Sequence, residues 1–313
     1  MRLLVTGIHG WIASAFADYS RMLGHDVTGS SRMIEQGVVQ TPLINGETDW
    51  SVALSGCDVV VHLAARAHIM RDSEREPLAV YRAVNTAGTL NLARQAAASG
   101  VKRFVFVSSV KVHGEKNLAA HPFREDDLLA PVDAYGISKR EAEDGLKALA
   151  RKTAMEIVII RPPLVYGPGV KGNFHLMLDW VARGIPLPLG AIRNVRSLVA
   201  LDNLVDFISL CADPERSPKA ANQTFLISDG EDVSTTELLI KIGKVLGTRP
   251  RLLSVPPGLI RLVARFLGQS AMIERLLASL VVDGSKAREM LGWQPVVTME
   301  SQLEKMTVHA AIT

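Results

Sequence analysis

Short apolar runs alternate with longer stretches of helical periodicity through the first half of the chain. The apolar runs have the length and near-continuous hydrophobicity of strands that are buried on both faces of a parallel sheet. They lie at residues 3–6, 26–28, 58–63, 104–107 and 157–160. The helical stretches between them include residues 84–98 and 138–151. This alternation predicts an α/β fold with a doubly wound parallel sheet and helices on both faces.

The pattern changes after residue 166. Residues 167–172 are rich in glycine and proline, and Pro186 and Pro188 mark further turns. Beyond them the hydrophobic positions follow helical spacing, as they do at residues 259–267. We therefore predict a second, smaller lobe that consists mainly of helices.

A glycine-rich turn follows the first strand candidate at once, in the stretch Gly7-Ile-His-Gly10-Trp-Ile-Ala13. A strand, a glycine turn and a helix in this order form the context of a dinucleotide-binding turn. Gly7 permits the tight turn, Gly10 lets the backbone approach a pyrophosphate, and Ala13 allows the helix to pack closely on the strand. The helix N-terminus then faces the phosphates. The spacing Gly-x-x-Gly-x-x-Ala differs from the commoner Gly-x-Gly-x-x-Gly.

The turn and the change of pattern together predict the domain organisation. We expect a Rossmann-type, dinucleotide-binding domain over residues 1–166 and a mainly substrate-binding lobe over residues 167–313. Residues 223–227 have the composition of a strand that returns to the sheet. The first domain is therefore expected to include later segments near residues 196–212 and 223–228, so that the two lobes interleave.

The composition excludes several classes of protein. The chain has 313 residues, of which 48% are hydrophobic and 21% charged, as in globular domains. No apolar run reaches the roughly 18 residues of a membrane helix, and the net charge of +3 is too small to indicate a nucleic-acid or lipid-surface partner. Cys57 and Cys211 match no metal spacing. We expect a cytoplasmic protein with reduced thiols and no metal.

Tyr135 and Lys139 are the strongest candidates for chemistry. They lie four residues apart, on one face of a predicted helix whose N-cap is Asp133. A neighbouring ammonium and the positive end of the helix dipole both favour a phenolate. Lowering the pKa of Tyr135 by about 3 units would require about 4 kcal/mol of differential stabilisation. An isolated pair of this kind is usually an ordinary surface pair, but the dinucleotide turn favours a catalytic one.

The motifs together resemble the extended short-chain dehydrogenase/reductase family over nearly the whole chain. Its sugar-nucleotide branch contains 4-epimerases, 4,6-dehydratases and 4-keto reductases. The motifs that carry the resemblance are Thr6-Gly-x-x-Gly10-x-x-Ala13, His62-Leu-Ala-Ala65, Asn85, Ser108-Ser109, Tyr135-x-x-x-Lys139, Arg161-Pro-x-x-x-Tyr166-Gly-Pro168 and Leu291-Gly-Trp-Gln-Pro295. The family habit also implies a homodimer that forms through residues 84–98 and 138–151.

The resemblance implies a role for each matching residue. The catalytic residues would be Ser109, Tyr135 and Lys139, and His113 would be a packing or sugar-wall residue instead of a base. The cofactor would be held by Gly7, Gly10, Trp11, Ile12, Ser31, Arg32, Leu63, Ala64, Ala65, Val107, Tyr135, Lys139, Pro162 and Leu164. The substrate would be held by Ser109, Lys111, Tyr135, Asn173, Arg196 and Arg275. Arg196 and Arg275 suit a nucleotide diphosphate, because a guanidinium pairs with phosphate oxygens in a bidentate way.

The end of the second strand indicates which cofactor is bound. An acidic residue at this place usually receives the ribose hydroxyls of NAD. Here the chain reads Gly29-Ser30-Ser31-Arg32, which suits a 2′-phosphate. We therefore expect NADP to be preferred, with NAD possible.

The residues after Ser109 reduce the number of possible reactions. Dehydratases of this family carry Asp-Glu where this chain has Val110-Lys111, so elimination is not expected. A 4-keto reductase and a 4-epimerase remain. The NADP preference favours a reductase of UDP-4-keto-6-deoxy-hexose or -hexosamine, in surface polysaccharide synthesis. The alternative is a 4-epimerase of UDP-glucose or UDP-N-acetylglucosamine. Minor alternatives are a non-catalytic NADP sensor and a dehydrogenase of a small carbonyl compound.

Overall fold

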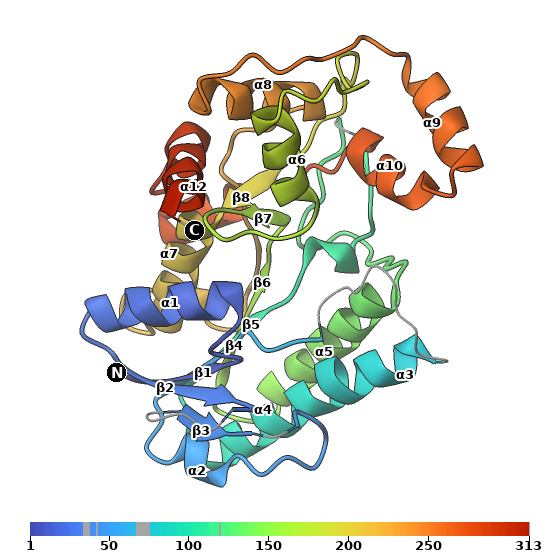
Figure 1. Ribbon diagram of the computed structural model, residues 1–313. Coiled ribbons are helices and arrows are strands. Elements are labelled where there is room, and N and C mark those ends of the chain that lie inside the picture. The colour runs from blue at the N-terminus through green and yellow to red at the C-terminus, as the bar shows by residue number, and fades with distance from the viewer. Residues whose placement is uncertain (34–37, 42, 67–75, 119, 313) are drawn as a thin grey trace.

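A computed structural model describes residues 1–33, 38–41, 43–66, 76–118 and 120–312, except for the side chains of residues 173, 271–272 and 308–312. A seven-stranded sheet, parallel throughout, forms the centre of one part of the molecule (Figure 1). Its spatial order is β3-β2-β1-β4-β5-β6-β9. The strands are β1 (Arg2–Thr6), β2 (Asp26–Ser31), β3 (Val38–Gln40), β4 (Val59–His62), β5 (Arg103–Val107), β6 (Glu156–Arg161) and β9 (Thr224–Leu226). The predicted fold class is confirmed.

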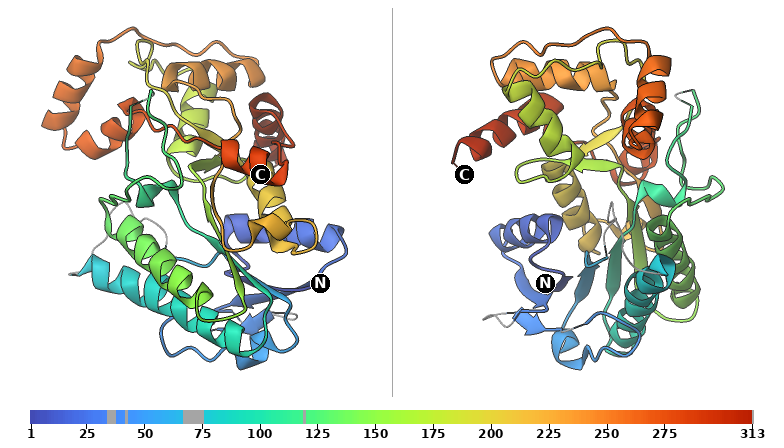
Figure 2. Two further views of the ribbon diagram at one scale, coloured as in Figure 1. Left: turned by 180° about the vertical axis from the view of Figure 1, so that it is seen from behind. Right: turned by 45° about the vertical axis from the view of Figure 1, so that its right-hand side comes forward.

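Helices cover both faces of this sheet, which the right-hand view of Figure 2 shows edge-on. Alternate residues of β1 face opposite sides, as the pleat requires. Leu3 and Val5 share a core with α1 (Trp11–Met22), α7 (Leu201–Ala212) and α11 (Ser285–Leu291). Leu4 belongs to the other core, with α2 (Ser51–Leu54), α4 (Thr89–Ala98) and α5 (Ala134–Ala150). Each helix buries one apolar stripe, so the sheet is protected from water on both sides.

The helical segment predicted at residues 84–98 begins earlier and is less regular. It consists of α3 (Pro77–Tyr81), a π-helical segment η1 (Arg82–Gly88) and α4. Pro77 opens α3 at the first helical position, where the missing N–H costs nothing. The other predicted helix, α5, begins at Ala134, and the Oδ1 atom of Asp133 accepts the Gly136 N–H at 2.7 Å. The predicted N-cap is therefore confirmed.

The second part of the molecule lies above the sheet in Figure 1 and has its own core. A two-stranded parallel sheet, β7 (Leu164–Tyr166) with β8 (Leu198–Ala200), is a feature that the sequence analysis did not predict. The helices here are α6 (Asn173–Ala182), α8 (Thr235–Val245), α9 (Pro257–Phe266), α10 (Ser270–Leu277) and α12 (Met299–Ile312). Short helices η2 (Val110–Val112) and η3 (Pro218–Ala220) complete the described elements.

The chain returns to the first sheet after entering the second part. The strand β9 pairs with β6, as predicted for residues 223–227, and α7 packs into the same core as α1. The predicted domain boundary at residue 166 stays a prediction. Among the described residues, we find no helix whose length and apolar character would carry it across a bilayer.

Candidate active site

The predicted cofactor residues gather at one edge of the sheet. Gly7 follows β1, Leu63 follows β4, Val107 ends β5, Pro162 follows β6 and Ser31 ends β2. These strands are neighbours and run parallel, so their carboxyl ends meet at the same edge. This is where open α/β sheets bind ligands.

The glycine turn has the geometry that a pyrophosphate requires. Gly7 has a φ of +68°, and a Cβ on it would lie 3.0 Å from the Ala64 Cα. Gly10 is the N-cap of α1, with its N–H donating to the Gly7 carbonyl at 2.7 Å. No described side chain caps α1, and its first turn carries no acidic residue. Its first N–H groups are thus suited to an external anion, and the turn fits a dinucleotide.

Trp11 connects this turn to the second part of the molecule. Its Nε1 donates to the Pro168 carbonyl at 2.6 Å, and Pro168 follows directly after β7 and Gly167. The neighbouring Ile12 is half-buried and packs against the core of the sheet. The glycine turn is therefore hydrogen-bonded directly to the segment through which the chain enters the second part of the molecule.

A buried hydrogen-bond network fixes the loop after β4. The Thr6 hydroxyl accepts the N–H groups of Leu63 and Ala64, each at 3.1 Å, and it lies 2.7 Å from the His62 Nδ1. The hydroxyl must therefore donate to Nδ1, and Nε2 carries the proton toward Thr89 at 2.8 Å. Burial lowers the pKa of His62 to about 3, so the ring is neutral. This network places residues 63–65 beside Gly7.

The predicted lowering of the Tyr135 pKa is wrong. Burial, followed by the Asp133 charge, raises the pKa of Tyr135, whereas the Ser109 hydroxyl lowers it through a hydrogen bond. The Lys139 Nζ donates to the Val107 carbonyl at 2.9 Å and lies 6.0 Å from the centre of the Tyr135 ring. Burial also lowers the pKa of Lys139 to about 7, so its own positive charge is weakened.

The predicted substrate residues converge on one cavity of about 490 Å³. It lies between the carboxyl edge of the sheet and the second part of the molecule. Its lining includes the predicted residues Ser109, Lys111, Tyr135, Leu164, Arg196 and Arg275. Asn173 begins α6 next to Gly172, which also lines the cavity, but its side chain lies outside the described part of the structure.

Two of the cations that line the cavity, Lys111 and Arg196, are held differently. The Lys111 Nζ lies 2.5 Å from the Asp133 Oδ2 and 3.2 Å from the Glu115 Oε1. Lys111 therefore neutralises the N-cap of the helix that carries Tyr135. Arg196 is largely buried, and its Nη1 donates to the carbonyls of Arg275 and Ala278.

The end of β2 shows how the predicted 2′-phosphate residues lie. Ser31 is buried, and its Oγ accepts the Met33 N–H at 3.1 Å, so this hydroxyl supports the turn. Arg32 is exposed beside it. Gly29 passes so close to Ile8 that a Cβ on it would lie 2.8 Å from the Ile8 Cγ1. The strand end thus needs its glycine in order to approach the nucleotide turn.

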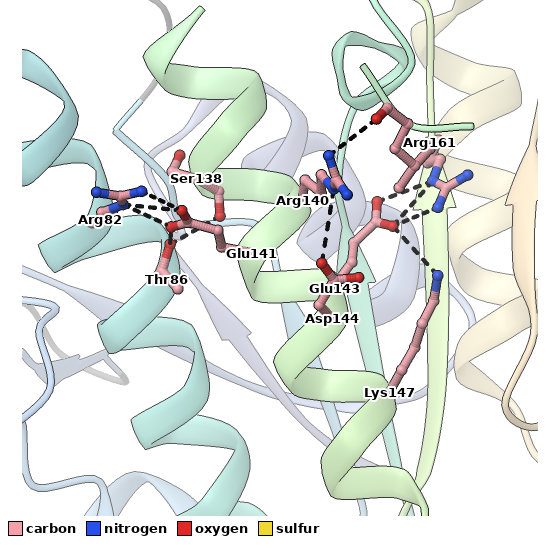
Figure 3. A network of polar contacts seen from close by, with 10 residues as sticks. Arg82, Thr86, Ser138, Arg140, Glu141, Glu143, Asp144, Lys147 and Arg161 are labelled. Atoms are coloured by element: carbon pink, nitrogen blue, oxygen red, sulfur yellow. Dashed lines mark hydrogen bonds and ion pairs between the residues drawn. The ribbon is translucent and has the colours of Figure 1, made fainter. Parts of the chain in front are cut away.

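Arg161 anchors α5, the helix that carries Tyr135 and Lys139. Its Nε and Nη2 donate to the Glu143 carboxylate of α5, with a shortest distance of 2.6 Å (Figure 3). Its Nη1 donates to the His113 Nε2 and to the Glu125 carbonyl, both at 2.9 Å. His113 is buried and stacks on Phe123, so it packs as expected. Burial and Arg161 lower the pKa of His113 to about 4.

The sequence analysis missed one wall of the cavity. The N-terminus of α8 contributes Val233, Ser234, Thr235 and Leu238 to the lining. Ser234 and Glu237 form a capping box there, with reciprocal bonds of 2.7 and 3.0 Å. The pattern Ser-x-x-Glu before an apolar run could have located this helix start. Within the described residues, no group of His, Cys, Asp and Glu side chains is placed to hold a metal ion.

Comparison with known proteins extends this picture. The model of the NAD dependent epimerase/dehydratase family matches residues 3–225. A Vibrio cholerae protein named UDP-glucose 4-epimerase is 52% identical over 268 residues, covering 85% of this chain and 80% of that protein. A UDP-glucose 4-epimerase of Mycolicibacterium smegmatis is 28% identical, with 97% of each chain covered.

A solved structure extends the similarity to the whole fold. The crystal structure of Thermotoga maritima UDP-glucose 4-epimerase with UDP-glucose is 25% identical to this chain. The two structures superpose with a TM-score of 0.79, over 100% of this chain and 99% of the other. The predicted resemblance to extended short-chain dehydrogenases/reductases is confirmed. Because the family model spans most of the chain and one relative is 52% identical over 85% of it, the chain belongs to the NAD dependent epimerase/dehydratase family.

Proposed function

We propose that this chain is an NAD-dependent 4-epimerase that inverts the configuration at C4 of a UDP-hexose. The observation that carries the proposal is that Ser109, Tyr135, Arg196 and Arg275, which come from distant segments, line the same cavity. The lining thus combines groups suited to proton transfer with guanidinium groups that suit a diphosphate. The 52% identity to a protein named UDP-glucose 4-epimerase supports the same conclusion.

In this mechanism, bound NAD would supply the hydride acceptor at C4 and return the hydride to the opposite face. Tyr135 takes the proton from the C4 hydroxyl and later gives it back. Ser109 donates a hydrogen bond to the same oxygen, where negative charge develops. Arg196 and Arg275 hold the nucleotide diphosphate while the sugar turns over.

Lys139 connects cofactor binding, at the carboxyl edge of the sheet, with proton transfer by Tyr135. In the free chain the Tyr135 phenol is protonated, because burial raises its pKa. A phenolate therefore needs more positive charge than the free chain places beside it. Anionic groups of a cofactor at this edge would favour the ammonium form of Lys139, which would in turn favour the Tyr135 phenolate. We assign Lys139 to this task and to holding ribose hydroxyls.

The comparisons favour the epimerase, which is the alternative of the sequence analysis, over the 4-keto reductase. They also give no support to a preference for NADP. What still favours the reductase is the end of β2, where Ser31 and Arg32 stand in place of an acidic residue. Because the Ser31 hydroxyl is engaged within its own turn, we propose NAD as the cofactor. Dimerisation through η1–α4 and α5 stays a prediction.

A turnover assay without reduced cofactor tests the proposal. Purified protein with NAD and UDP-glucose, and separately with UDP-N-acetylglucosamine, is expected to form the C4 epimer, detected by NMR. Tyr135→Phe should lower kcat by about 10²- to 10⁴-fold, whereas Tyr81→Phe, a change to a neighbouring ring outside the cavity lining, serves as the control. If no epimer forms but NADPH is consumed with a UDP-4-keto-6-deoxy-hexose, the enzyme is the reductase.

A further inference from the structure

The helix α9 presents an apolar face to the solvent. Figures 1 and 2 show α9 at the outer end of the second part, beside α10. Ile260 and Ala264 point inward and are buried. The outer face of α9 consists of Leu259, Leu262, Val263, Phe266 and Leu267, each about half exposed or more, with Phe266 at 84%. An apolar stripe of this size on one helix is unusual for a surface that faces only water.

The same region holds the positive charge of the chain. Residues 248–278 contain five arginines and one glutamate, a net charge of +4, whereas the whole chain carries +3. The remaining residues are therefore slightly acidic in sum. One of the five arginines, Arg275, lines the cavity, so the other four carry the charge of this region. Two of the arginines, Arg261 and Arg265, lie on α9 itself, which has no acidic residue. Arg261 pairs with Glu274 of α10 at 2.7 Å. The small net charge of the chain conceals this local concentration.

The exposed face belongs to a preformed helix. Pro257 occupies the first helical position, where its ring fixes a helical φ. Gly268 ends the helix with a φ of +66°, and its N–H reaches the Arg265 carbonyl at 3.4 Å. Both ends are thus specified by the sequence, and the apolar face exists without a partner to induce it.

We propose that the outer face of α9 docks the protein onto the surface of an anionic lipid bilayer. An amphipathic helix with arginines beside an apolar stripe lies in the headgroup region, with its apolar side chains in the acyl boundary. A nucleic acid would match the charge but leave the apolar face in water. At ten residues, α9 is too short to span a bilayer, which requires about 20.

Docking through α9 would bring the substrate cavity close to the bilayer. The neighbouring α10 packs against α9 and contributes Arg275 and Leu276 to the cavity lining. The proposal does not rest on the proposed function, because it concerns a surface that turnover of a UDP-hexose does not use.

Vesicle flotation with the full chain tests the docking. The protein is expected to float with vesicles of phosphatidylglycerol mixed with phosphatidylcholine, and much less with phosphatidylcholine alone. Phe266→Ser should weaken partitioning at least about tenfold. Met22→Ser, which removes a side chain of similar exposure (83%) from α1, should leave it unchanged. Arg265→Glu should weaken binding and its salt dependence, whereas the matched helix-end change Arg21→Glu should not.

Other outcomes of these experiments would overturn the docking proposal. Wild-type protein that stays unbound, or that binds both vesicle types equally, overturns the proposal. Equal losses in Phe266→Ser and Met22→Ser also overturn it. Light scattering that shows oligomers lost on Phe266→Ser, without vesicle binding, assigns the face to a second copy of the chain. Circular dichroism and epimerase turnover in the absence of lipid establish that Phe266→Ser is folded, and they separate this test from that of the proposed function.

Discussion

Replacing Arg161 by methionine should destabilise the fold strongly, although Arg161 does not line the cavity. Its guanidinium is only 1% exposed and joins the end of β6 to the middle of α5 (Figure 3). The Glu143 carboxylate that it holds is fully buried, and the nearest other cation is the Lys147 Nζ at 3.8 Å. Arg161→Met therefore removes the main partner of a buried carboxylate.

The size of the effect follows from what is left behind. Besides Glu143, the substitution deprives the His113 Nε2 and the Glu125 carbonyl of their donor. Breaking a buried ion pair by removing one partner costs about 3–5 kcal/mol, because the remaining charge stays desolvated. Domains of this kind have unfolding free energies of about 5–15 kcal/mol, so a large fraction of the stability is lost. The double variant Glu143→Leu/Arg161→Met should recover much of that loss.

Urea unfolding followed by circular dichroism measures the effect. The matched control is Arg140→Met, because Arg140 lies on α5 with Glu143 but is 43% exposed, and its bonds are a long 3.8 Å ion pair with Asp144 and a hydrogen bond to the Leu129 carbonyl. That change should cost less than about 1 kcal/mol. If Arg161→Met costs no more than the control, or if the double variant is less stable than the single one, the argument from an unpaired buried charge is refuted.

Three further predictions concern the site. Burial lowers the pKa of Lys139 to about 7, so between pH 7 and about 10 the unfolded chain binds more protons than the folded chain does. The free energy of unfolding should therefore rise with pH over this range. Lys139→Met should flatten that rise, as urea titrations at several pH values would show. Lys111→Met removes the 2.5 Å ion pair of Asp133, and the stronger negative charge there raises the pKa of Tyr135 further, so the pH–rate profile for kcat should move to higher pH. Trp11→Phe removes the 2.6 Å bond to Pro168 and part of the indole's packing against both cores. It should lower the unfolding free energy by at least about 1 kcal/mol, as thermal unfolding would show.

The first half of the fold was predictable because its signals are local. The turn at Gly7 and Gly10 needs only a strand before it and a helix after it, and both lie within the first 22 residues. The cap at Asp133 is equally local. By contrast, β7 and β8 have three residues each and are more than 30 residues apart, so neither alternation nor length distinguishes them from loops. Their pairing depends on packing in the second part.

The candidate site was also predictable only where its signals are local in the sequence. Ser109, Arg196 and Arg275 reach one cavity from distant segments, and only the resemblance to a family connected them in advance. Glu143 could not have been identified as a buried anchor, because it lies in a stretch with Arg140, Glu141, Asp144 and Lys147 that has the composition of a solvated helix face. Its partner Arg161 is 18 residues away in the sequence, at the end of a strand. Long-range ion pairs of this kind leave no periodic signal.

The wrong prediction for Tyr135 shows that the spacing of two residues does not determine their pKa values. A spacing of four residues places Tyr135 and Lys139 on one face of α5, but Lys139 is buried and Tyr135 is half-buried, and removal from water disfavours both the phenolate and the ammonium. The cap that positions Tyr135 also adds a negative charge, because Asp133 raises the pKa of the phenol. Lys111 offsets that charge at 2.5 Å, so the free chain holds a protonated tyrosine beside a weakened cation. Under the proposed function, Tyr135 would therefore need a stronger cation at Lys139 to act as the base, and the anionic groups of a bound cofactor would supply the charge that favours it.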